Sequence, residues 1–215
     1  MYKSPDSIMN NLISRYSNLG VCQDDIYDAY KMLIDCYDSG KKVLIAGNGG
    51  SGADAGHIVG ELMKGFMLKR PISGKLYDRL ANSSDVMGLT LATKLQRALP
   101  AIDLTAHNPL NTAFSNDVDA SLIFAQQVLG YGNSGDVFWG LSTSGNSKNI
   151  IYAIYTAKAK GLKTLAMTGK SGGDMANIAD ITIKAPATST PEIQELHLPI
   201  YHALCAMVEA HFFRE

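Results

Sequence analysis

The chain has 215 residues, 46% of them hydrophobic, and a formal net charge of −1 at pH 7. This length and apolar fraction suit one domain with a large core, or one domain with a helical extension. The near-zero charge excludes a general nucleic-acid-binding surface, and no apolar run reaches the roughly 18 residues of a membrane-spanning helix. We therefore expect neither nucleic acid nor a membrane as a partner.

Three cysteines, Cys22, Cys36 and Cys205, are widely spaced in the sequence. Without the close pairs typical of metal sites, they are predicted to be reduced and mostly buried. A catalytic cysteine is disfavoured because none of them lies in a Gly/Ser-rich turn. Since no secretory leader is recognisable either, we expect a cytoplasmic protein.

Residues 1–40 are predicted to form a helical arm. Ser4-Pro5 is a typical helix start, with one helix running to about Asn18 and a second from about Gln23 to Asp38. Later helices suffice to cover the sheet, so we expect the apolar stripes of the arm to build a subunit interface, with packing on the chain's own sheet as the alternative. These stripes are Ile8, Leu12 and Tyr16 in the first helix, and Ile26, Ala29, Leu33 and Tyr37 in the second.

The stretch from Val43 to Ser51 predicts an anion site. Val43 to Ala46 suits a buried parallel strand, three glycines follow it, and Ser51 is a natural N-cap for a helix over 52–66. Glycines let a ligand approach the backbone, and the free N–H groups of a helix start attract anions. Such a turn can also be only a tight connection, and it matches neither a dinucleotide fingerprint nor a Walker A loop. His57 and Glu61 lie four residues apart, on one face of the predicted helix.

The rest of the chain alternates between strands and helices. Residues 67–99 are predicted to be a long excursion with one or two short helices inside a single domain, 1–215. Strands are then expected over 100–105, 136–141, 163–168 and 180–184, with helices over 117–130, 148–160 and 190–213 between and after them. This order predicts an α/β fold with a five-stranded parallel sheet covered on both faces.

A second polar loop, Ser142-Thr-Ser-Gly-Asn-Ser147, follows the third predicted strand and precedes a helix. Hydroxyls and free backbone N–H groups at a helix start can hold a phosphate without a large positive charge. The alternative is a capped helix with surplus serines. Since carboxyl ends of parallel strands share one edge of the sheet, the two loops are expected to form one site.

Four motifs in this order resemble the sugar-isomerase (SIS) domain family, and most of all its phosphoheptose isomerases. They are Ala46-Gly-Asn-Gly-Gly-Ser-Gly-Ala-Asp-Ala-Gly-His57-x-x-x-Glu61-Leu, Ser142-Thr-Ser-Gly-Asn-Ser147, Leu165-x-x-Thr-Gly-Lys170 and Ile193-Gln-Glu-x-His197-x-x-x-x-His202. The resemblance covers nearly the whole chain except residues 67–99. It implies a flavodoxin-like three-layer sandwich, and homotetramers whose sites lie between subunits.

The resemblance also implies roles for individual residues. Glu61 and His202 match the acid/base pair of the family. The residues that match substrate-binding positions are Asn48, Gly49, Gly50, Ser51, Asn116, Asp117, Ser142, Thr143, Ser144, Ser147 and Gln194. In members that bind zinc, the ligand positions match His57, Glu61, Gln194 and His202. Gln is a poor zinc ligand, so a protein without a metal is the alternative.

Three features depart from the family pattern. Residues 67–99 are longer than the usual connection, Gly56 stands where a larger residue is common, and Pro199 lies between Gln194 and His202. An interior proline usually kinks a helix, which affects how well these two side chains converge. Periodicity alone does not separate His197 from His202; only the family match does.

The implied reaction is the interconversion of a ketose and an aldose phosphate, sedoheptulose 7-phosphate and glycero-manno-heptose 7-phosphate, through an enediol. It needs a base, an acid and a phosphate anchor. The alternative is a non-catalytic SIS module that binds a phosphosugar or a protein, as in relatives that regulate replication initiation. Glu61 and His202 are both present, which favours an enzyme. Outside the motifs, Glu61 would be read as a solvated helix residue and His202 as a core histidine.

Overall fold

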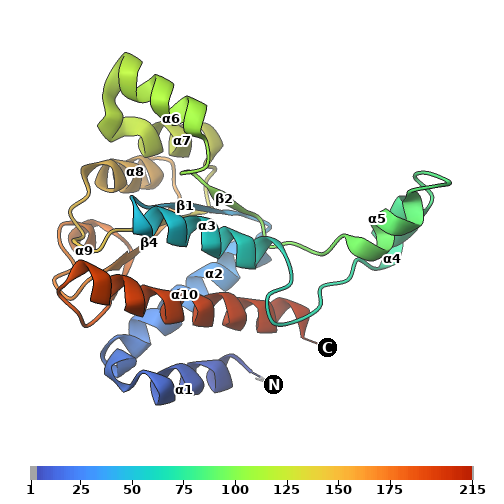
Figure 1. Ribbon diagram of the computed structural model, residues 1–215, viewed down its shortest axis with the longest axis horizontal. Coiled ribbons are helices and arrows are strands. Elements are labelled where there is room, and N and C mark those ends of the chain that lie inside the picture. The colour runs from blue at the N-terminus through green and yellow to red at the C-terminus, as the bar shows by residue number, and fades with distance from the viewer. Residues whose placement is uncertain (1–3, 215) are drawn as a thin grey trace.

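A five-stranded parallel sheet forms the centre of the computed structural model, which describes residues 4–214. The spatial order is β2 (Ala101–Asp103), β1 (Val43–Ala46), β3 (Val137–Leu141), β4 (Lys163–Thr168) and β5 (Ile181–Lys184) (Figure 1). Every neighbouring pair is parallel. All residues of β1 and β3 are buried, as expected for strands covered on both faces. The predicted sheet is confirmed.

Helices cover both faces of this sheet, which gives three layers. Alternate residues of β1 belong to two separate cores, Val43 and Ile45 to one and Leu44 and Ala46 to the other. The first core includes α2 (Gln23–Asp38), α3 (Gly50–Met63) and α10 (Thr190–Phe213). The second includes α7 (Ile123–Tyr131), α8 (Lys148–Ala159) and α9 (Met175–Ile178). The predicted α/β sandwich is confirmed. None of the helices in residues 4–214 is long and apolar enough to cross a membrane.

The N-terminal arm packs on the chain's own body. Helix α1 (Pro5–Arg15) begins at a capping box on Ser4 and lies against α10, while α2 lies on the sheet and α10. A 3-10 helix, η1 (Ser17–Cys22), connects them, so α1 ends before the predicted Asn18. Except for Tyr16, which is half-buried, the stripe residues named above are all buried within the chain. The expectation that these stripes are left over for a subunit interface is therefore wrong. Residues 1–3 of the predicted arm lie outside the described residues.

The helix predicted over 117–130 is broken in the structure. Helix α6 (Asn108–Phe114) runs into a π-helical turn, η2 (Ser115–Asp119), which is followed by a 3-10 turn, η3 (Ala120–Leu122), and α7. The break lies at Asp119, whose backbone is extended (φ −165°) and whose carboxylate accepts from the N–H of Ser121. An Asp that bonds the backbone ahead of it competes with the helix ladder, which explains the break.

Residues 67–99 leave the body and return to it. Within them, α4 (Gly74–Ala81) and α5 (Gly88–Lys94) form a helical hairpin that stands away from the sandwich (Figure 1). Their two connections are joined by an isolated antiparallel bridge between Pro71 and Gln96. The predicted short helices are thus present, although α5 ends before the expected Ala98.

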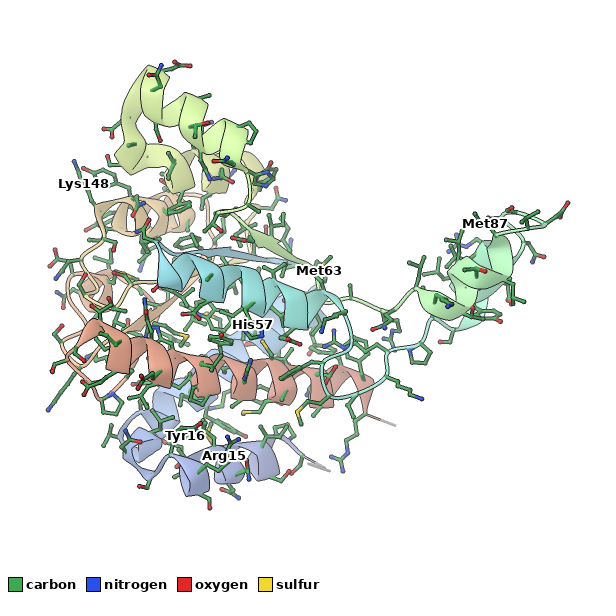
Figure 2. All side chains as sticks on the ribbon, in the orientation of Figure 1. Arg15, Tyr16, His57, Met63, Met87 and Lys148 are labelled. Atoms are coloured by element: carbon green, nitrogen blue, oxygen red, sulfur yellow. The ribbon has the colours of Figure 1, made fainter. Side chains whose placement is uncertain are left out.

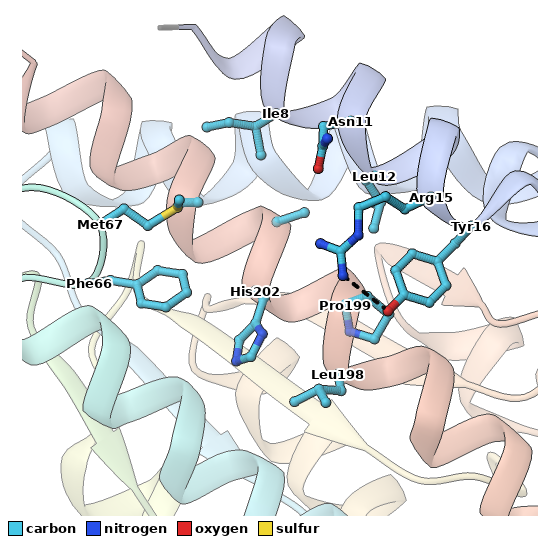
Figure 3. Close-up of a pocket in the computed structure, with 12 residues that line it drawn as sticks. Ile8, Asn11, Leu12, Arg15, Tyr16, Phe66, Met67, Leu198, Pro199 and His202 are labelled. Atoms are coloured by element: carbon cyan, nitrogen blue, oxygen red, sulfur yellow. Dashed lines mark hydrogen bonds between the residues drawn. The ribbon is translucent and has the colours of Figure 1, made fainter. Parts of the chain in front are cut away.

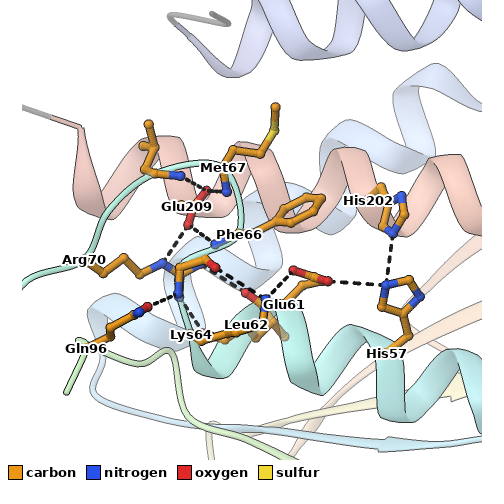
Figure 4. Close-up of polar contacts among 12 residues, drawn as sticks. His57, Glu61, Leu62, Lys64, Phe66, Met67, Arg70, Gln96, His202 and Glu209 are labelled. Carbon is orange, nitrogen blue, oxygen red and sulfur yellow. Dashed lines mark hydrogen bonds and ion pairs between the residues drawn. The ribbon is translucent and has the colours of Figure 1, made fainter. Parts of the chain in front are cut away.

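A buried ion pair holds the segment that follows α3. The Glu209 carboxylate of α10 accepts from Arg70 Nε at 2.8 Å and from the backbone N–H groups of Phe66, Met67 and Leu68. Arg70 also donates to the carbonyls of Leu62 and Glu61 (Figure 4). Neither side chain of the pair is exposed. These bonds satisfy the last carbonyls of α3, which therefore ends at Met63 rather than at the predicted Phe66.

We expect Glu209→Ala to lower the free energy of unfolding by about 3–5 kcal/mol, because it leaves the Arg70 guanidinium buried without a counter-charge. Urea denaturation measures the change. Glu195→Ala, an exposed site on the same helix, is the matched control and should change stability by less than about 0.5 kcal/mol. Arg70→Met with Glu209→Leu should recover part of the loss. A Glu209→Ala variant as stable as the control contradicts this account.

Candidate active site

The two polar loops meet at one pocket. Because β1 and β3 are parallel neighbours, their carboxyl ends carry residues 47–51 and 142–147 to the same edge of the sheet. Together with the start of α10 they surround a pocket of about 310 Å³. Its lining residues are Asn48, Gly49, Gly50, Ser51, Leu141, Ser142, Thr143, Ser147, Thr190 and Gln194. Most of the predicted substrate-binding residues are therefore brought together.

Glycines shape the first loop. Gly49 has φ +54° and is the N-cap of α3, so the helix begins at Gly50. The prediction that Ser51 caps this helix is wrong, because Ser51 lies inside the first turn and is buried. A Cβ on Gly50 would lie only 2.5 Å from Gln194 Nε2, so glycine lets α10 approach the helix start. The first N–H groups of α3 lack helical partners and lie at the pocket.

The hydroxyls of the second loop lie close to one another. Ser142 Oγ is 2.8 Å from Ser147 Oγ and 3.4 Å from Ser144 Oγ. Ser147 is the N-cap of α8, yet its side chain makes no capping hydrogen bond. The alternative of serines used for capping is thus not favoured, and the hydroxyl group of Ser147 is directed at Ser142 instead. This arrangement suits an oxyanion that accepts from several hydroxyls.

A pair of side-chain amides joins the two loops. Asn48 Nδ2 donates to Asn149 Oδ1, and Asn149 Nδ2 donates to Asn48 Oδ1, both at 2.9 Å. Asn48 was predicted to contact substrate, whereas Asn149 was missed. Asn149 lies in the first turn of α8, directly after the Ser-rich loop. No sequence signal distinguishes it from other polar residues of that turn, since its partner is about a hundred residues away.

A cluster of titratable side chains lies between α3 and α10 (Figure 4). His57 Nε2 is 3.3 Å from Glu61 Oε1 and 3.4 Å from His202 Nε2. Lys64 Nζ lies 3.2 Å from the other oxygen of Glu61. The predicted acid/base pair, Glu61 and His202, is thus linked through His57. His197 is fully buried, with Nε2 3.1 Å from the carbonyl of Thr168, so His202 is the histidine at the site.

A tyrosine and an aspartate fix the orientation of His57. The Tyr201 hydroxyl donates to Asp54 Oδ1 at 3.2 Å and lies 3.0 Å from His57 Nδ1. Since the hydroxyl proton goes to Asp54, the hydroxyl oxygen accepts from Nδ1–H, and Nε2 carries the lone pair of the neutral ring. Sequence reasoning missed both residues. Asp54 lies one turn before His57, but Tyr201 gives no signal that separates it from core aromatics.

Burial shapes the proton affinities of the cluster. Burial lowers the pKa of His202, and the neighbouring His57 lowers it further, while the Glu61 carboxylate opposes both. Burial raises the pKa of Asp54, against the effect of the hydrogen bond from Tyr201. Burial first, and then the nearby Asp54, raise the pKa of Tyr201. At neutral pH His202 is therefore mostly neutral, and Tyr201 keeps its proton.

An open pocket of about 250 Å³ adjoins His202 (Figure 3). Its walls come from α1, from α10 and from Phe66 and Met67 of the segment after α3. Arg15 and Tyr16 line the same pocket, and Arg15 Nη2 lies 3.5 Å from the Tyr16 hydroxyl. Most of the remaining lining is apolar. This pocket was not predicted, because its walls come from three distant segments.

Three of the predicted substrate-binding residues, Asn116, Asp117 and Ser144, do not line the pocket of the two loops. Asn116 and Asp117 are exposed on the π-helical turn, where they bond each other at 2.9 Å, and neither lines the pocket of the two loops. Gln194 lies in that pocket against Gly50, about two turns of α10 before His202. In residues 4–214, the His, Cys, Asp and Glu side chains form no group of three arranged to hold a metal ion. The four predicted zinc ligands are thus not assembled at one point.

Comparison with known proteins identifies the family. A model described as the SIS domain matches residues 87–169. The phosphoheptose isomerase of Sulfurimonas denitrificans is 38% identical over 188 residues, which cover 87% of this chain and 83% of that protein. This chain belongs to the phosphoheptose isomerase family. The phosphoheptose isomerase of Aneurinibacillus thermoaerophilus is 40% identical over 181 residues, 84% of this chain and 78% of that protein. The structure of the phosphoheptose isomerase from Francisella tularensis superposes with a TM-score of 0.75 at 32% identity, covering 94% and 95% of the two chains.

Two departures from the phosphoheptose isomerase pattern have a structural explanation. A Cβ on Gly56 would lie 3.2 Å from Asp103 Oδ2, so a residue larger than glycine would crowd the carboxylate at the end of β2. Pro199 is buried inside α10, which continues from Thr190 to Phe213 as one helix. Gln194 and His202 therefore stay on one helix but serve different parts of the site.

We expect replacement of Ser142 and Ser144 by Ala to weaken binding of inorganic phosphate and of phosphorylated sugars by at least about tenfold. Each hydroxyl that donates to a charged oxygen contributes about 1.5–3 kcal/mol. Isothermal titration calorimetry measures the change. The matched control replaces Ser14 and Ser17, exposed serines of α1 and η1, and should bind as the wild type does. Equal affinities in the two variants would remove this loop as the anchor.

Proposed function

We propose that this protein interconverts sedoheptulose 7-phosphate and glycero-manno-heptose 7-phosphate. The observation that carries the proposal is the position of two sites on one helix. Helix α3 starts at the phosphate pocket and carries His57 and Glu61 further along. At 1.5 Å per residue, His57 lies about 10 Å along the axis from Gly50. A sugar phosphate anchored at the two loops would thus extend along α3 toward the acid/base cluster.

The cluster supports proton transfer through an enediol. In the proposed reaction the Glu61 carboxylate takes the proton from the carbon beside the carbonyl and returns it to the neighbouring carbon. His202 serves the two oxygens, whose protons exchange positions as the carbonyl moves. Its lowered pKa keeps the imidazole neutral at neutral pH, so one ring nitrogen can accept a proton while the other donates one. His57, held by Tyr201, keeps the two groups at a fixed separation.

We also propose that the cluster of His57, Glu61 and His202 binds Zn²⁺. Two imidazoles and one carboxylate are suitable zinc donors. His57, Glu61 and His202 are not arranged around one point in the structure, so they would hold the ion only after their side chains turn toward it. The hydrogen bond to Tyr201 leaves the His57 Nε2 lone pair facing Glu61 Oε1 at 3.3 Å. An imidazole nitrogen and a carboxylate oxygen that face each other in this way are both suitable zinc donors. When bound, Zn²⁺ would polarise the sugar carbonyl. Gln194 lies at the phosphate pocket and would bind the substrate instead of the metal ion.

We also propose that the protein is cytoplasmic and acts as a homotetramer with its sites between subunits. The support is the family membership and the open pocket beside His202, which a neighbouring subunit could close. Light scattering at micromolar concentration measures the assembly. A monomer with full isomerase activity would contradict it.

We expect Glu61→Gln to lower kcat by at least about a hundredfold with little change in KM, because the amide keeps the shape of the side chain but cannot take a proton. The assay follows the aldose formed from sedoheptulose 7-phosphate. Glu195→Gln, the same change at an exposed site, should leave kcat unchanged. An active wild type with an unimpaired Glu61→Gln variant excludes Glu61 as the base. A wild type that binds the sugar without turnover favours the non-catalytic module instead.

We expect Tyr201→Phe to weaken Zn²⁺ binding by about tenfold or more, because partners that orient a ligating histidine contribute about 10–100-fold to metal affinity. Calorimetric titration with Zn²⁺ measures the dissociation constant. Tyr30→Phe is a close control, since its hydroxyl lies 3.4 Å from Nδ1 of another histidine, His211, far along α10. A wild type without measurable Zn²⁺ affinity rejects zinc. Equal affinities of both variants reject the role of Tyr201.

A further inference from the structure

The hairpin of α4 and α5 has no part in the proposed reaction. A short antiparallel stalk carries it: Pro71 is bridged to Gln96, and Arg97 N donates to the Arg70 carbonyl at 2.8 Å. The stalk starts at Arg70, the residue held by Glu209, so the base of the hairpin is firmly anchored. Beyond it, the two helices stand clear of the sandwich, and Met87 lies far from the rest of the molecule (Figure 2).

The hairpin exposes an unusual amount of apolar surface. In residues 4–214 there are fifteen exposed large hydrophobic side chains, and six of them lie in the hairpin: Leu76, Val86, Met87, Leu89, Leu91 and Leu95. Val86 is 85% exposed and Leu89 64%. Helix α4 buries no side chain at all, and α5 buries only Gly88 and Ala92. Helices of seven or eight residues are only marginally stable in water unless they pack against something, so we expect this apolar surface to have a partner.

The same chain offers a complementary surface beside His202. The lining of the pocket between α1 and α10 is mostly apolar (Figure 3), although Ile8, Leu12 and Ala206 are themselves buried in the core. At this pocket Met67 and Leu198 are 49% and 40% exposed. Met67 and Leu198 therefore give the body an exposed apolar site at this pocket, and the hairpin carries a second one.

The position of the stalk connects the two surfaces. Phe66 and Met67 line the pocket, and the stalk begins three residues later at Arg70. The hairpin leaves from this rim and points outward (Figure 1), so it does not cover its own pocket. A two-fold axis near the rim would place each hairpin on the pocket of the other copy, which satisfies both surfaces at once.

The charges also favour a second copy. Residues 69–97 carry six of the 19 basic residues of the chain but only two of its 20 acidic ones, so the remainder of the chain has the acidic excess. Arg70 is buried against Glu209, which leaves five exposed basic residues and two exposed acidic ones in this segment. The outer face of α2, for example, exposes Asp24, Asp28, Asp35 and Asp38. A basic hairpin and an acidic body attract each other between copies. The pocket itself is lined by Arg15 and by no carboxylate, so this attraction acts between the hairpin and the body as a whole, and the contact at the pocket is apolar.

We propose that the α4–α5 hairpin of one protomer docks on a second copy of this chain, over the pocket between α1 and α10. The contact is reciprocal, and the hairpin closes the pocket beside His202 from outside. Only this last consequence, closure of the active site, rests on the proposed function. The docking itself depends on the two surfaces alone and can be measured without any activity.

Light scattering on three proteins tests the docking. Replacement of Val86, Met87 and Leu89 by Ser removes apolar area only from exposed positions, so the fold should persist, as circular dichroism can verify. We expect this variant to lose at least half of the molar mass of the wild type at micromolar concentration. The matched control replaces Val21, Val118 and Tyr155, which are 78%, 64% and 55% exposed outside the hairpin, and should keep the wild-type mass.

Cross-linking tests the position of the contact. Met87→Cys combined with Leu198→Cys, treated with a bismaleimide, should give a covalent dimer, whereas Met87→Cys with Tyr155→Cys should not. The native cysteines are all buried and should not react. A monomeric wild type, a hairpin variant of unchanged mass, or equal cross-linking of both pairs would overturn the proposal. A monomer would leave a different protein as the partner of the hairpin. A loss of mass in a protein without isomerase activity would support the docking and reject only the proposed function.

Discussion

Two contacts between α3 and α10 determine where the chemistry can occur. At one end, Gly50 lets Gln194 approach the start of α3. At the other end, the buried Arg70–Glu209 pair joins the last carbonyls of α3 to α10. His57 and Glu61 lie between these contacts on one helix, and His202 lies on the other. Because both ends are fixed, the packing of the two helix backbones sets the separation between the imidazoles and the carboxylate. The side chains therefore need little further ordering to come together. Preorganisation of this kind is what acid/base catalysis requires.

The parallel sheet supplies the second half of the site. Its switch point lies between β1 and β3, where the loops with Asn48 and Ser142 leave adjacent strands on the same edge. The same helix, α3, begins at this edge and ends at the ion pair. The pocket of the two polar loops and the cluster of His57 and Glu61 are therefore two positions along one rigid element, so their spacing is set by helical rise rather than by loop conformation.

Local chemistry explains what could be predicted from the sequence. Short apolar runs next to glycine and serine loops indicate buried strands, and the spacing of His57 and Glu61 places them on one face. Long-range geometry explains what was missed. Tyr201 and Asn149 acquire their roles only from partners more than a hundred residues away, Asp54 and Asn48. Ser51 looked like a cap because a glycine cap has no side chain to signal it. The arm was assigned to an interface because apolar stripes do not reveal which surface covers them. Asp119 broke a helix that periodicity alone would continue.

The amide pair of Asn48 and Asn149 has a consequence for how a ligand enters. Each amide gives one donor and one acceptor to the other, so the pair joins the first loop to the start of α8 beside the pocket. Both bonds are at the surface, where water replaces them readily, so separating the amides costs about 1 kcal/mol or less per bond. A sugar that inserts a hydroxyl between them restores both bonds, whereas a ligand with a methylene at that point does not. The pair would therefore favour a ligand that offers a hydroxyl group at this point over the deoxy analogue of that ligand, without any charge.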